Sequence, residues 1–384
     1  MEVKEVIRSY RSRPLAGKLK DNSTGRRGQR QSHLSFNFLN FFNFFNFLTI
    51  LVFACLLSSC QQSDYEYDDT PQGNLDALWT LIDQRYCFLS YKEQELGFSW
   101  AELHAKYSDK LGQKMSRVQL FEVLCQMLSE LKDGHVNIST SLDLGRNWSW
   151  KEDFPENLDT ELRQQYLGTD YHIGSGLKYT ILPDNIAYVV YESFSDAIGE
   201  GNLSDMITYL RLCNGMILDI RGNSGGELTN AERLSQRFTN EKVLVGYMCH
   251  KTGKGHDDFS EPEAEYIEPS KNIRWQKPVV LLVNRSCFSA ANTFVRNMKE
   301  MPLVTVMGDQ TGGGSGLPFT SELPIGWSVR FSASPMFDAK MQHIEFGIEP
   351  DVPAALDEAL AKEGKDSMIE EARKFISDNI QGIR

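Results

Sequence analysis

The 384-residue chain lacks several features that would place it in a familiar structural class. Its 29 glycines show no three-residue period, which excludes a collagen-like fibre. Its seven cysteines are widely spaced and form no CxxC pair, so they indicate neither a disulfide framework nor a zinc site, and buried free thiols are expected. No motif indicates a metal or a cofactor, and the glycine-rich stretch 308–316 lacks the lysine of a phosphate-binding loop.

Positive charge is scarce outside the N-terminus. Residues 1–30 hold nine Lys or Arg against three Asp or Glu, and residues 31–59 hold none of either. The formal charge of the chain is −12, so the remaining 325 residues carry −18. Such an acidic body lacks the basic contacts that phosphates need, and nucleic acid is therefore not an expected partner. The share of apolar residues, 41%, is that of a globular protein, and the length favours two folded units with appendages.

The first 59 residues have the composition of a secretory signal peptide with an extended basic region. The basic stretch is followed by a Phe-rich run that sharpens into the apolar core 47–57, which is short for a bilayer span. An uncleaved anchor helix would have to include the Asn-interrupted run from Phe36. Leu57-Ser58-Ser59-Cys60 resembles the lipobox of bacterial lipoproteins, in which the cysteine becomes the acylated N-terminus. We therefore expect lipidation at Cys60, an acidic tether over 60–73, and an extracytoplasmic location on the cell envelope, periplasmic or at the outer-membrane surface.

Two hydrophobic periods divide the rest of the chain. Apolar residues at helical spacing predict a small helical domain over 74–135, whose first helix Asn74 would cap. From 136 to 384, short apolar strands alternate with helices, which predicts an α/β domain with parallel strand pairs. The expected strands are 186–190, 216–220, 243–248, 279–283 and 304–307, with a hairpin over 317–331. The expected helices are 200–213, 228–238, one from Ser289, and 355–380, and the charged stretch 250–274 is expected to be a solvated loop.

Four polar segments lie at the junctions between these elements. Asp133-Gly134-His135 ends the helical domain, where a side chain can face a cleft. The turn 219–226 joins a strand to a helix, and its glycines let N–H groups point at an oxyanion or a phosphate. Ser289 begins a helix, where its hydroxyl would lie beside unpaired N–H groups. The glycine-rich segment 308–316 is expected to form one wall of the cleft. Each segment alone has an ordinary structural interpretation, namely a junction histidine, a tight turn or a helix cap.

These segments in this order, closed by the GIEPD sequence at 347–351, resemble the S41 serine peptidases, that is, the tail-specific (C-terminal processing) proteases and their tricorn-like relatives. The likeness covers roughly 75–355. It implies a crotonase-like ββα catalytic core with a mixed sheet, and peptide or protein substrates. It also implies Ser289 as the nucleophile, with an oxyanion hole formed by the N–H groups of Gly225, Gly226 and Ala290.

The resemblance departs from the tail-specific pattern in two places. Those proteases activate their serine with a lysine where this chain has Gly314, whereas tricorn-like members use a histidine that matches His135. A neutral imidazole could take the Ser289 proton and return it to the leaving amine. Such a base needs an orienting acceptor, for which Glu345 is the nearest match, with Asp133 or His343 as alternatives. Only about forty residues separate His135 from the strand expected near Leu177, too few for the PDZ domain that many members carry.

Two other functions remain open. The segment 222–226 matches G-x-S-x-G around Ser224, and Asp338 and His343 follow in the order of an α/β-hydrolase-like esterase. That scheme leaves the segments at 131–135, 284–293 and 308–316 unexplained. The missing lysine also leaves room for a non-catalytic lipoprotein that holds peptides in the same cleft. We therefore expect an extracytoplasmic serine endopeptidase that forms an acyl-enzyme on Ser289 with His135 as general base.

Overall fold

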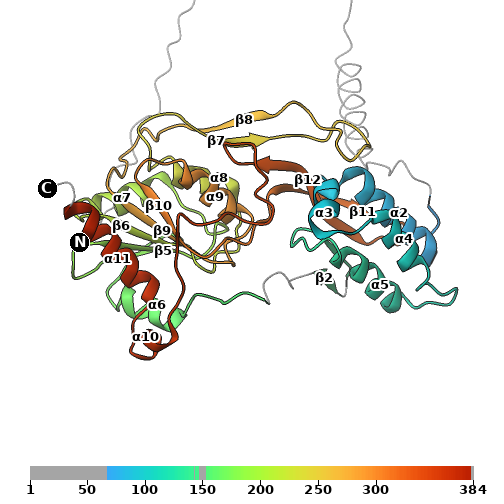
Figure 1. Ribbon diagram of the computed structural model, residues 1–384, viewed down its shortest axis with the longest axis horizontal. Helices are drawn as coiled ribbons and strands as arrows, with labels where there is room; N and C mark the ends of the chain where they lie inside the picture. The colour runs from blue at the N-terminus through green and yellow to red at the C-terminus, as the bar shows by residue number, and fades with distance from the viewer. Residues whose placement is uncertain (1–66, 142, 147–152, 382–384) are drawn as a thin grey trace, which may run out of the picture. The chain divides into compact units, whose positions relative to one another are not determined.

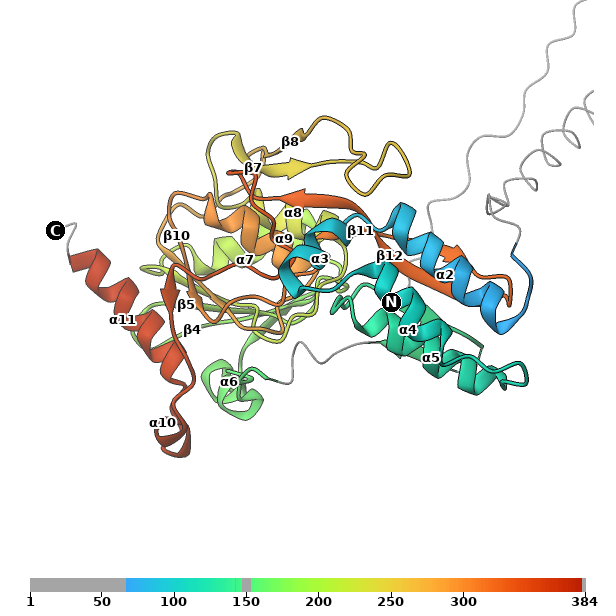
Figure 2. The same cartoon turned by 45° about the vertical axis from the view of Figure 1, so that its right-hand side comes forward.

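The computed structural model describes residues 67–141, 143–146 and 153–381 (Figure 1, Figure 2). The expected signal segment 1–59, Cys60 and the first part of the tether lie outside these residues. In the described part, two β-sheets and three apolar clusters organise the chain. The expected order, a helical region followed by an α/β core with a mixed sheet, is confirmed.

The N-terminal helices form where apolar residues at helical spacing follow good caps. They are α2 (Pro71–Arg85), α3 (Leu89–Leu96), α4 (Trp100–Ser108) and α5 (Arg117–Ser129). Ser116 and Gln119 make a reciprocal capping box at the start of α5. The first helix begins before the expected cap Asn74, because the side chain of Thr70 accepts the N–H of Gly73 and a proline occupies the first turn. The last residues assigned to the tether are thus helical.

The N-terminal helices share their core with an antiparallel sheet. Its strand order is β2-β1-β12-β7-β8, with β11 paired to β12. The strands are β1 (Asn137–Ser139), β2 (Leu144–Arg146), β7 (Val243–Met248), β8 (Glu263–Ile267), β11 (Gly316–Glu322) and β12 (Ser328–Phe337). Val329 and Phe331 of β12 are buried in the same apolar cluster as Leu78 of α2 and Leu124 of α5. The boundary expected at residue 135 therefore does not separate two cores.

A second, mixed sheet has the strand order β13-β10-β9-β6-β5-β4-β3. Its strands are β3 (His172–Gly174), β4 (Leu177–Ile181), β5 (Ala187–Tyr191), β6 (Met216–Asp219), β9 (Val279–Val283), β10 (Val304–Gly308) and β13 (Val352–Pro353). The strands from β5 to β13 pair in parallel, and β3 and β4 add an antiparallel edge. Because β6 and β9 are parallel neighbours, the glycine turn after β6 and Ser289 after β9 leave the same edge of the sheet.

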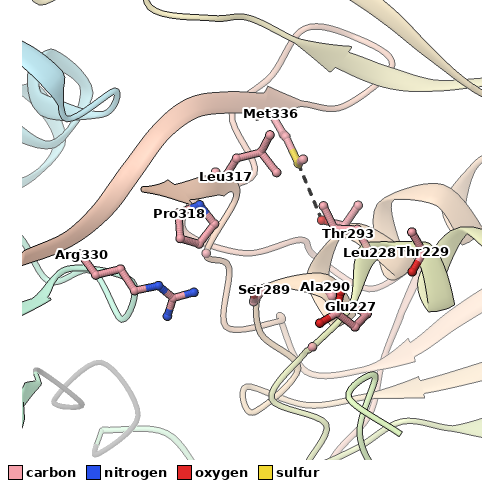
Figure 3. Close-up of a pocket in the computed structure, with 13 residues that line it drawn as sticks. Glu227, Leu228, Thr229, Ser289, Ala290, Thr293, Leu317, Pro318, Arg330 and Met336 are labelled. Carbon is pink, nitrogen blue, oxygen red and sulfur yellow. Dashed lines mark hydrogen bonds between the residues drawn. The ribbon is translucent and has the colours of Figure 1, made fainter. Parts of the chain in front are cut away.

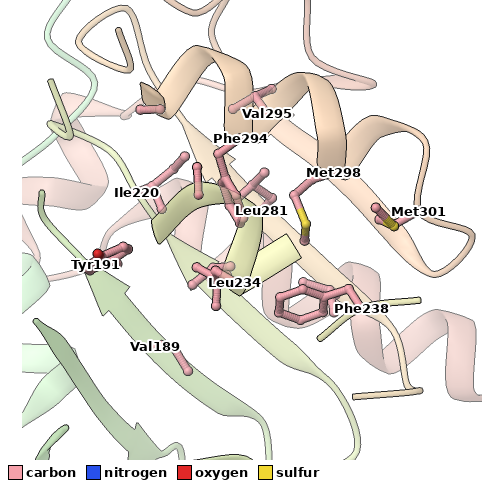
Figure 4. Packing of buried hydrophobic residues seen from close by; sticks show 14 of the residues in the cluster. Val189, Tyr191, Ile220, Leu234, Phe238, Leu281, Phe294, Val295, Met298 and Met301 are labelled. Carbon is pink, nitrogen blue, oxygen red and sulfur yellow. The ribbon is translucent and has the colours of Figure 1, made fainter. Parts of the chain in front are cut away.

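Helices cover both faces of the mixed sheet. The helices are α6 (Thr160–Leu167), α7 (Glu200–Leu210), α8 (Leu228–Ser235), α9 (Ala290–Lys299), α10 (Glu358–Lys362) and α11 (Ser367–Gln381). Leu234 and Phe294, from α8 and α9, pack with Leu281 on one face (Figure 4). Ile369 of α11 packs with Leu282 on the other face, because successive strand residues point to opposite sides.

Two expected elements differ from the structure. The stretch 250–274 contains β8, an edge strand that pairs with β7; it is mostly exposed and acidic, and so lacks the apolar pattern of a strand. The expected helix 355–380 is interrupted at Gly364, whose φ of 79° ends α10. Asp366 then accepts the N–H groups of Met368 and Ile369 and starts α11.

Candidate active site

Ser289 and His135 meet although 154 positions separate them in the chain. Nε2 of His135 lies 2.9 Å from Oγ of Ser289. Ser289 has φ 58° and ψ −121°, a left-handed conformation that favours glycine, and its N–H is held by the carbonyl of Gly313 at 2.9 Å. Its side chain makes no capping bond to α9, so the hydroxyl faces the imidazole instead of serving the helix.

Neighbouring side chains fix the imidazole of His135. Asp133 accepts the backbone N–H of His135 at 2.7 Å and, with its other oxygen, the hydroxyl of Tyr86 at 2.7 Å. Nδ1 of His135 lies 3.5 Å from Oγ of Ser332 on β12. The ring of Phe288 packs on the imidazole, with 4.8 Å between ring centres. The orientation of the ring therefore depends on a backbone bond, a hydroxyl and an aromatic contact.

Burial keeps the His135 side chain uncharged at neutral pH. The residue is 3% exposed, and desolvation lowers the pKa of its imidazole to about 4. The charge of Asp133 opposes this pKa shift, while the positive charges of Arg330 and Lys92 reinforce it. A neutral imidazole is the form that can accept a proton.

A buried ion pair lies in the same region. Nζ of Lys92 on α3 is 3.0 Å from Oε1 of Glu345, and both side chains are almost fully buried. Oε2 of Glu345 accepts the N–H of Ser315 at 2.9 Å. Burial and the charge of Asp133 raise the pKa of Glu345, and Lys92 acts against that rise. Within the described residues no hydrogen bond joins Glu345 to His135, so the Glu345 carboxylate binds Lys92 and the loop at 315 instead of the imidazole.

Gly314, where tail-specific proteases have their lysine, has no room for a side chain. An added Cβ would lie 2.3 Å from the ring of Phe288, and the φ of 76° disfavours any residue with a Cβ. The aromatic ring thus fills the space that a side chain at 314 would need, and it packs on His135. The position of the His135 imidazole and the lack of a side chain at Gly314 therefore depend on the same ring, that of Phe288.

The glycine turn after β6 lies against Ser289. A Cβ added to Gly225 would lie 2.9 Å from Cβ of Ser289 and 3.0 Å from the nitrogen of Ala290. The N–H of Gly225 already donates to Oδ1 of Asn223 at 2.9 Å, which removes it from the expected oxyanion hole. The N–H groups of Gly226 and Ala290 have no hydrogen-bond partner in the described part of the chain.

A buried ion cluster holds this turn in place. The guanidinium of Arg221 donates from Nε and Nη2 to the carboxylate of Asp219, at 2.9 and 2.7 Å. Its Nη1 donates to Asp366, the residue that starts α11, at 3.0 Å. All three side chains are fully buried. The conformation of the turn therefore depends on a residue near the other end of the chain.

A cavity of about 240 Å³ opens at Ser289 (Figure 3). Its walls are mostly apolar, and its lining includes Leu228, Ala290, Thr293, Leu317, Pro318 and Met336. Arg330 extends from β12 into the same space, and Glu227 lies on the α8 side. The cavity can hold one apolar side chain of moderate size beside the serine hydroxyl.

The three residues of the alternative esterase site do not come together. Ser224 is exposed in the glycine turn. Asp338 accepts the N–H groups of Lys340 and Gln342, and His343 stacks on Tyr91 at 4.0 Å. No hydrogen bond in the described part links any two of the three. The G-x-S-x-G match therefore belongs to the turn beside Ser289.

Three further properties concern only residues 67–141, 143–146 and 153–381. No three His, Cys, Asp or Glu side chains gather there as they would around a metal ion. No helix there has the length and apolar character needed to cross a membrane. Five cysteines in these ranges are free thiols, and all are buried except the half-buried Cys125.

Comparison with known proteins agrees with this arrangement. The model of peptidase family S41 matches residues 185–354, and the model of the tricorn protease C1 domain matches 67–129. The carboxy-terminal processing protease CtpA of Bacillus subtilis (strain 168) is 28% identical over 176 residues, which are 45% of this chain and 36% of that protein. The chain therefore aligns with little more than a third of that curated relative.

Solved structures extend the likeness to about four fifths of the chain. A crystal structure from Parabacteroides merdae ATCC 43184, described as that of a peptidase, is 45% identical with a TM-score of 0.77, covering 80% of this chain and 97% of its own. Mature CPAF complexed with lactacystin shares the fold, with a TM-score of 0.63 and 11% identity over 81% of this chain and 98% of its own.

An α/β core with a serine, an imidazole and free amides at one sheet edge is the arrangement of a serine peptidase. The chain belongs to peptidase family S41.

Several residues of the site are absent from the sequence-based expectations. They are Lys92, Tyr86, Phe288 and Ser332, of which only Phe288 lies in one of the four polar segments, directly before Ser289. Phe288 could have been found from Gly314, because a missing side chain in a packed site implies a neighbour that fills the space. Lys92 stands in a polar stretch typical of a solvated helix, which gives no sign of burial.

We expect replacement of Lys92 by Met to destabilise the protein strongly, because it leaves the buried Glu345 carboxylate without its counter-charge. The expected loss is about 3–5 kcal/mol of unfolding free energy, measured by urea denaturation. Adding Glu345→Gln should restore most of the loss. The matched control is Lys106→Met, which breaks an exposed pair with Glu130 and should cost less than about 1 kcal/mol. Equal losses for the two lysines would contradict this account.

Proposed function

We propose that the chain is a serine endopeptidase in which Ser289 is the nucleophile and His135 the general base. Nε2 of His135 takes the hydroxyl proton as Oγ attacks the carbonyl carbon of the scissile bond. The imidazolium then gives this proton to the leaving amine, and the C–N bond breaks to leave an acyl-enzyme. A water molecule, deprotonated by the same imidazole, attacks the ester and releases the acid with free Ser289.

The charge that develops on the carbonyl oxygen needs donors placed in advance. We assign this role to the N–H groups of Gly226 and Ala290, since Gly225 is already bonded to Asn223. Both amides border the cavity that contains Ser289. The N-terminus of α9, on which Ala290 lies, adds favourable potential for an oxyanion.

One observation carries the proposal, the 2.9 Å distance between Nε2 of His135 and Oγ of Ser289. A base must lie within hydrogen-bond reach of the proton that it abstracts and must be unprotonated. The lowered pKa of His135 meets the second condition. A protein that only holds peptides needs neither the strained backbone at Ser289 nor a desolvated imidazole facing it, so these features favour catalysis over the binding role.

The cavity at Ser289 bears on the choice of substrate. Its apolar walls fit a substrate with an aliphatic residue on the acyl side of the cleaved bond. The substrates we propose are extracytoplasmic proteins or peptides. This follows from the expected signal segment 1–59 and from lipidation at Cys60, which together would anchor the enzyme to the cell envelope.

Replacing Ser289 or His135 by Ala tests the catalytic pair. We expect either change to lower hydrolysis of fluorescent casein at least about 10³-fold, because each removes the nucleophile or its base. A fluorophosphonate probe should label the wild type at Ser289. The control Ser224→Ala should stay active and labelled. A folded wild type that neither reacts nor hydrolyses would favour the peptide-binding role, and activity that depends on Ser224 alone would favour the esterase.

The acid side of the pH profile reports the charge state of His135. Because the pKa of His135 is lowered to about 4, the imidazole stays unprotonated at pH values above that pKa. We therefore expect kcat/KM to stay level from pH 8 to about pH 5 and to decrease at lower pH. An ordinary histidine would lose activity near its usual pKa of about 6.5. Arg330→Gln removes a positive charge that lowers this pKa, and it should move the acid limb to higher pH. An acid limb near pH 6.5 in the wild type would contradict the desolvated base.

The proposed anchor is tested at Cys60. Cells grown with an alkyne-bearing fatty acid should incorporate it into the wild-type protein, and the protein should sediment with membranes. Cys60→Ser should abolish incorporation and leave the acyl-enzyme chemistry intact, since the lipobox residue lies in a separate segment. Equal labelling of both proteins would refute lipidation at this cysteine.

A further inference from the structure

A second cavity, of about 520 Å³, adjoins the site on the imidazole side. Gly134 and Phe288 line it, and they directly precede His135 and Ser289 in the chain. The other lining residues come from the helical region, the segment at 153–154 and the core: Leu96, Lys132, Asp153, Phe154, Arg285, Gln310, Gly312, Glu345 and Phe346. It is larger than the cavity at Ser289, and it is roomy enough for more than one residue of a peptide.

The guanidinium of Arg285 in this cavity has only neutral partners. Its Nη1 donates to the carbonyl of Thr311 at 3.1 Å, and its Nη2 donates to Oε1 of Gln310 at 2.8 Å. The guanidinium lies 3.6 Å above the ring of Phe154, and its Nε is buried without an acceptor. An arginine has five N–H donors, so several remain for a ligand. Neither Arg285 nor the exposed Lys132 forms an ion pair within the described residues.

This guanidinium is a partly desolvated cation. Burial lowers the pKa of Arg285, and the charges of Asp309 and Glu349 offset that effect only in part. An arginine keeps its charge under such conditions, so an anion that enters the cavity gains a strong electrostatic partner. The two carboxylates in the lining compete little, since Glu345 is bound to Lys92 and Asp153 is exposed to solvent.

The route of the proton decides which half of a substrate reaches this cavity. His135 must deliver the serine proton to the leaving amine, so the leaving half of the peptide lies on the imidazole side. The acyl half lies toward the amides of Gly226 and Ala290 and the cavity of Figure 3. Phe288, whose ring packs on the imidazole, forms part of the wall of the larger cavity.

We propose that the larger cavity is a subsite for the leaving peptide and that Arg285, assisted by Lys132, binds a carboxylate of that peptide there. This inference rests on the proposed function, which defines the leaving side. The carboxylate is either the C-terminal group of the substrate or the side chain of an Asp or Glu. The guanidinium of Arg285, held in place by its stacking on Phe154, would bind this single carboxylate at short range. At long range, the −18 charge of the body repels peptides that carry many acidic residues.

Binding to the full chain carrying Ser289→Ala tests the proposal without hydrolysis. The probes are acetyl-Ala-Ala-Leu-Ala-Ala with a free C-terminal carboxylate, the same peptide as its amide, and two amides that end in Glu or Gln. We expect a carboxylate-bearing peptide to bind at least about tenfold more tightly than its neutral counterpart in calorimetric titrations. A gain for the free acid identifies the C-terminus as the source, and a gain for the Glu amide identifies a side chain.

Variants then assign the gain to a residue. Arg285→Gln should remove the preference and leave the affinity for the neutral amide within about twofold, while Arg285→Lys should keep part of it. Lys132→Gln should reduce it in part, and within the described residues the exposed Lys132 side chain makes no hydrogen bond or ion pair. The control is Arg117→Gln, which removes an exposed charge outside both cavities.

Equal binding of charged and neutral peptides would overturn the proposal, as would an equal effect of the Arg117 and Arg285 variants. Hydrolysis of the same four peptides by the wild type separates this proposal from the one on which it rests. If the wild type hydrolyses neither casein nor any of these peptides although the preference depends on Arg285, the proposed peptidase function fails and the carboxylate site stands. If the peptides are cleaved after Leu and bind without a charge preference, only the present inference fails.

Discussion

The imidazole of His135 reaches Ser289 because the N-terminal helices and the β11–β12 hairpin share one apolar core. Phe331 of β12 is buried with the side chains of α2 and α5, and the N–H of Cys87 donates to the carbonyl of Ser332 at 3.0 Å. The same strand extends to Met336, which packs in the core of the mixed sheet. The β11–β12 hairpin thus spans the two regions that contain His135 and Ser289 (Figure 1). The hairpin thereby helps to keep the imidazole of His135 within hydrogen-bond distance of the Ser289 hydroxyl.

The charges around the site are compatible with a neutral imidazole at His135. Lys92 and Glu345 cancel one another in a buried pair, and Asp133 uses its oxygens on the backbone of His135 and on Tyr86. Among the residues that the structure describes, these groups are already bound to other partners, and no carboxylate accepts a hydrogen bond from the imidazole ring. Desolvation then dominates its pKa. This differs from an arrangement in which a carboxylate stabilises the protonated ring.

Most of the fold could be predicted from the sequence, and the site could be predicted in part. A continuous apolar run marks β9 at the residues expected, because a strand buried on both faces needs no polar alternation. The apolar run of β7 also lies at the residues expected, although most of that strand is only half-buried. The meeting of His135 and Ser289 followed from the order of motifs. Lys92 could not be foreseen, since its burial arises from the loop at 345 folding over α3. The exposed edge strand β8 escaped notice because its residues read as a charged loop.

The contact between Asp366 and Arg221 links the end of the chain to the amides beside Ser289. Arg221 is fully buried under the glycine turn, so without the Asp366 carboxylate one arm of its guanidinium would be desolvated and would lack its charged acceptor. Loss of the Asp366 carboxylate would therefore disturb the amides beside Ser289 from a distant position in the sequence, so the start of α11 belongs to the support of the site as much as the turn itself does.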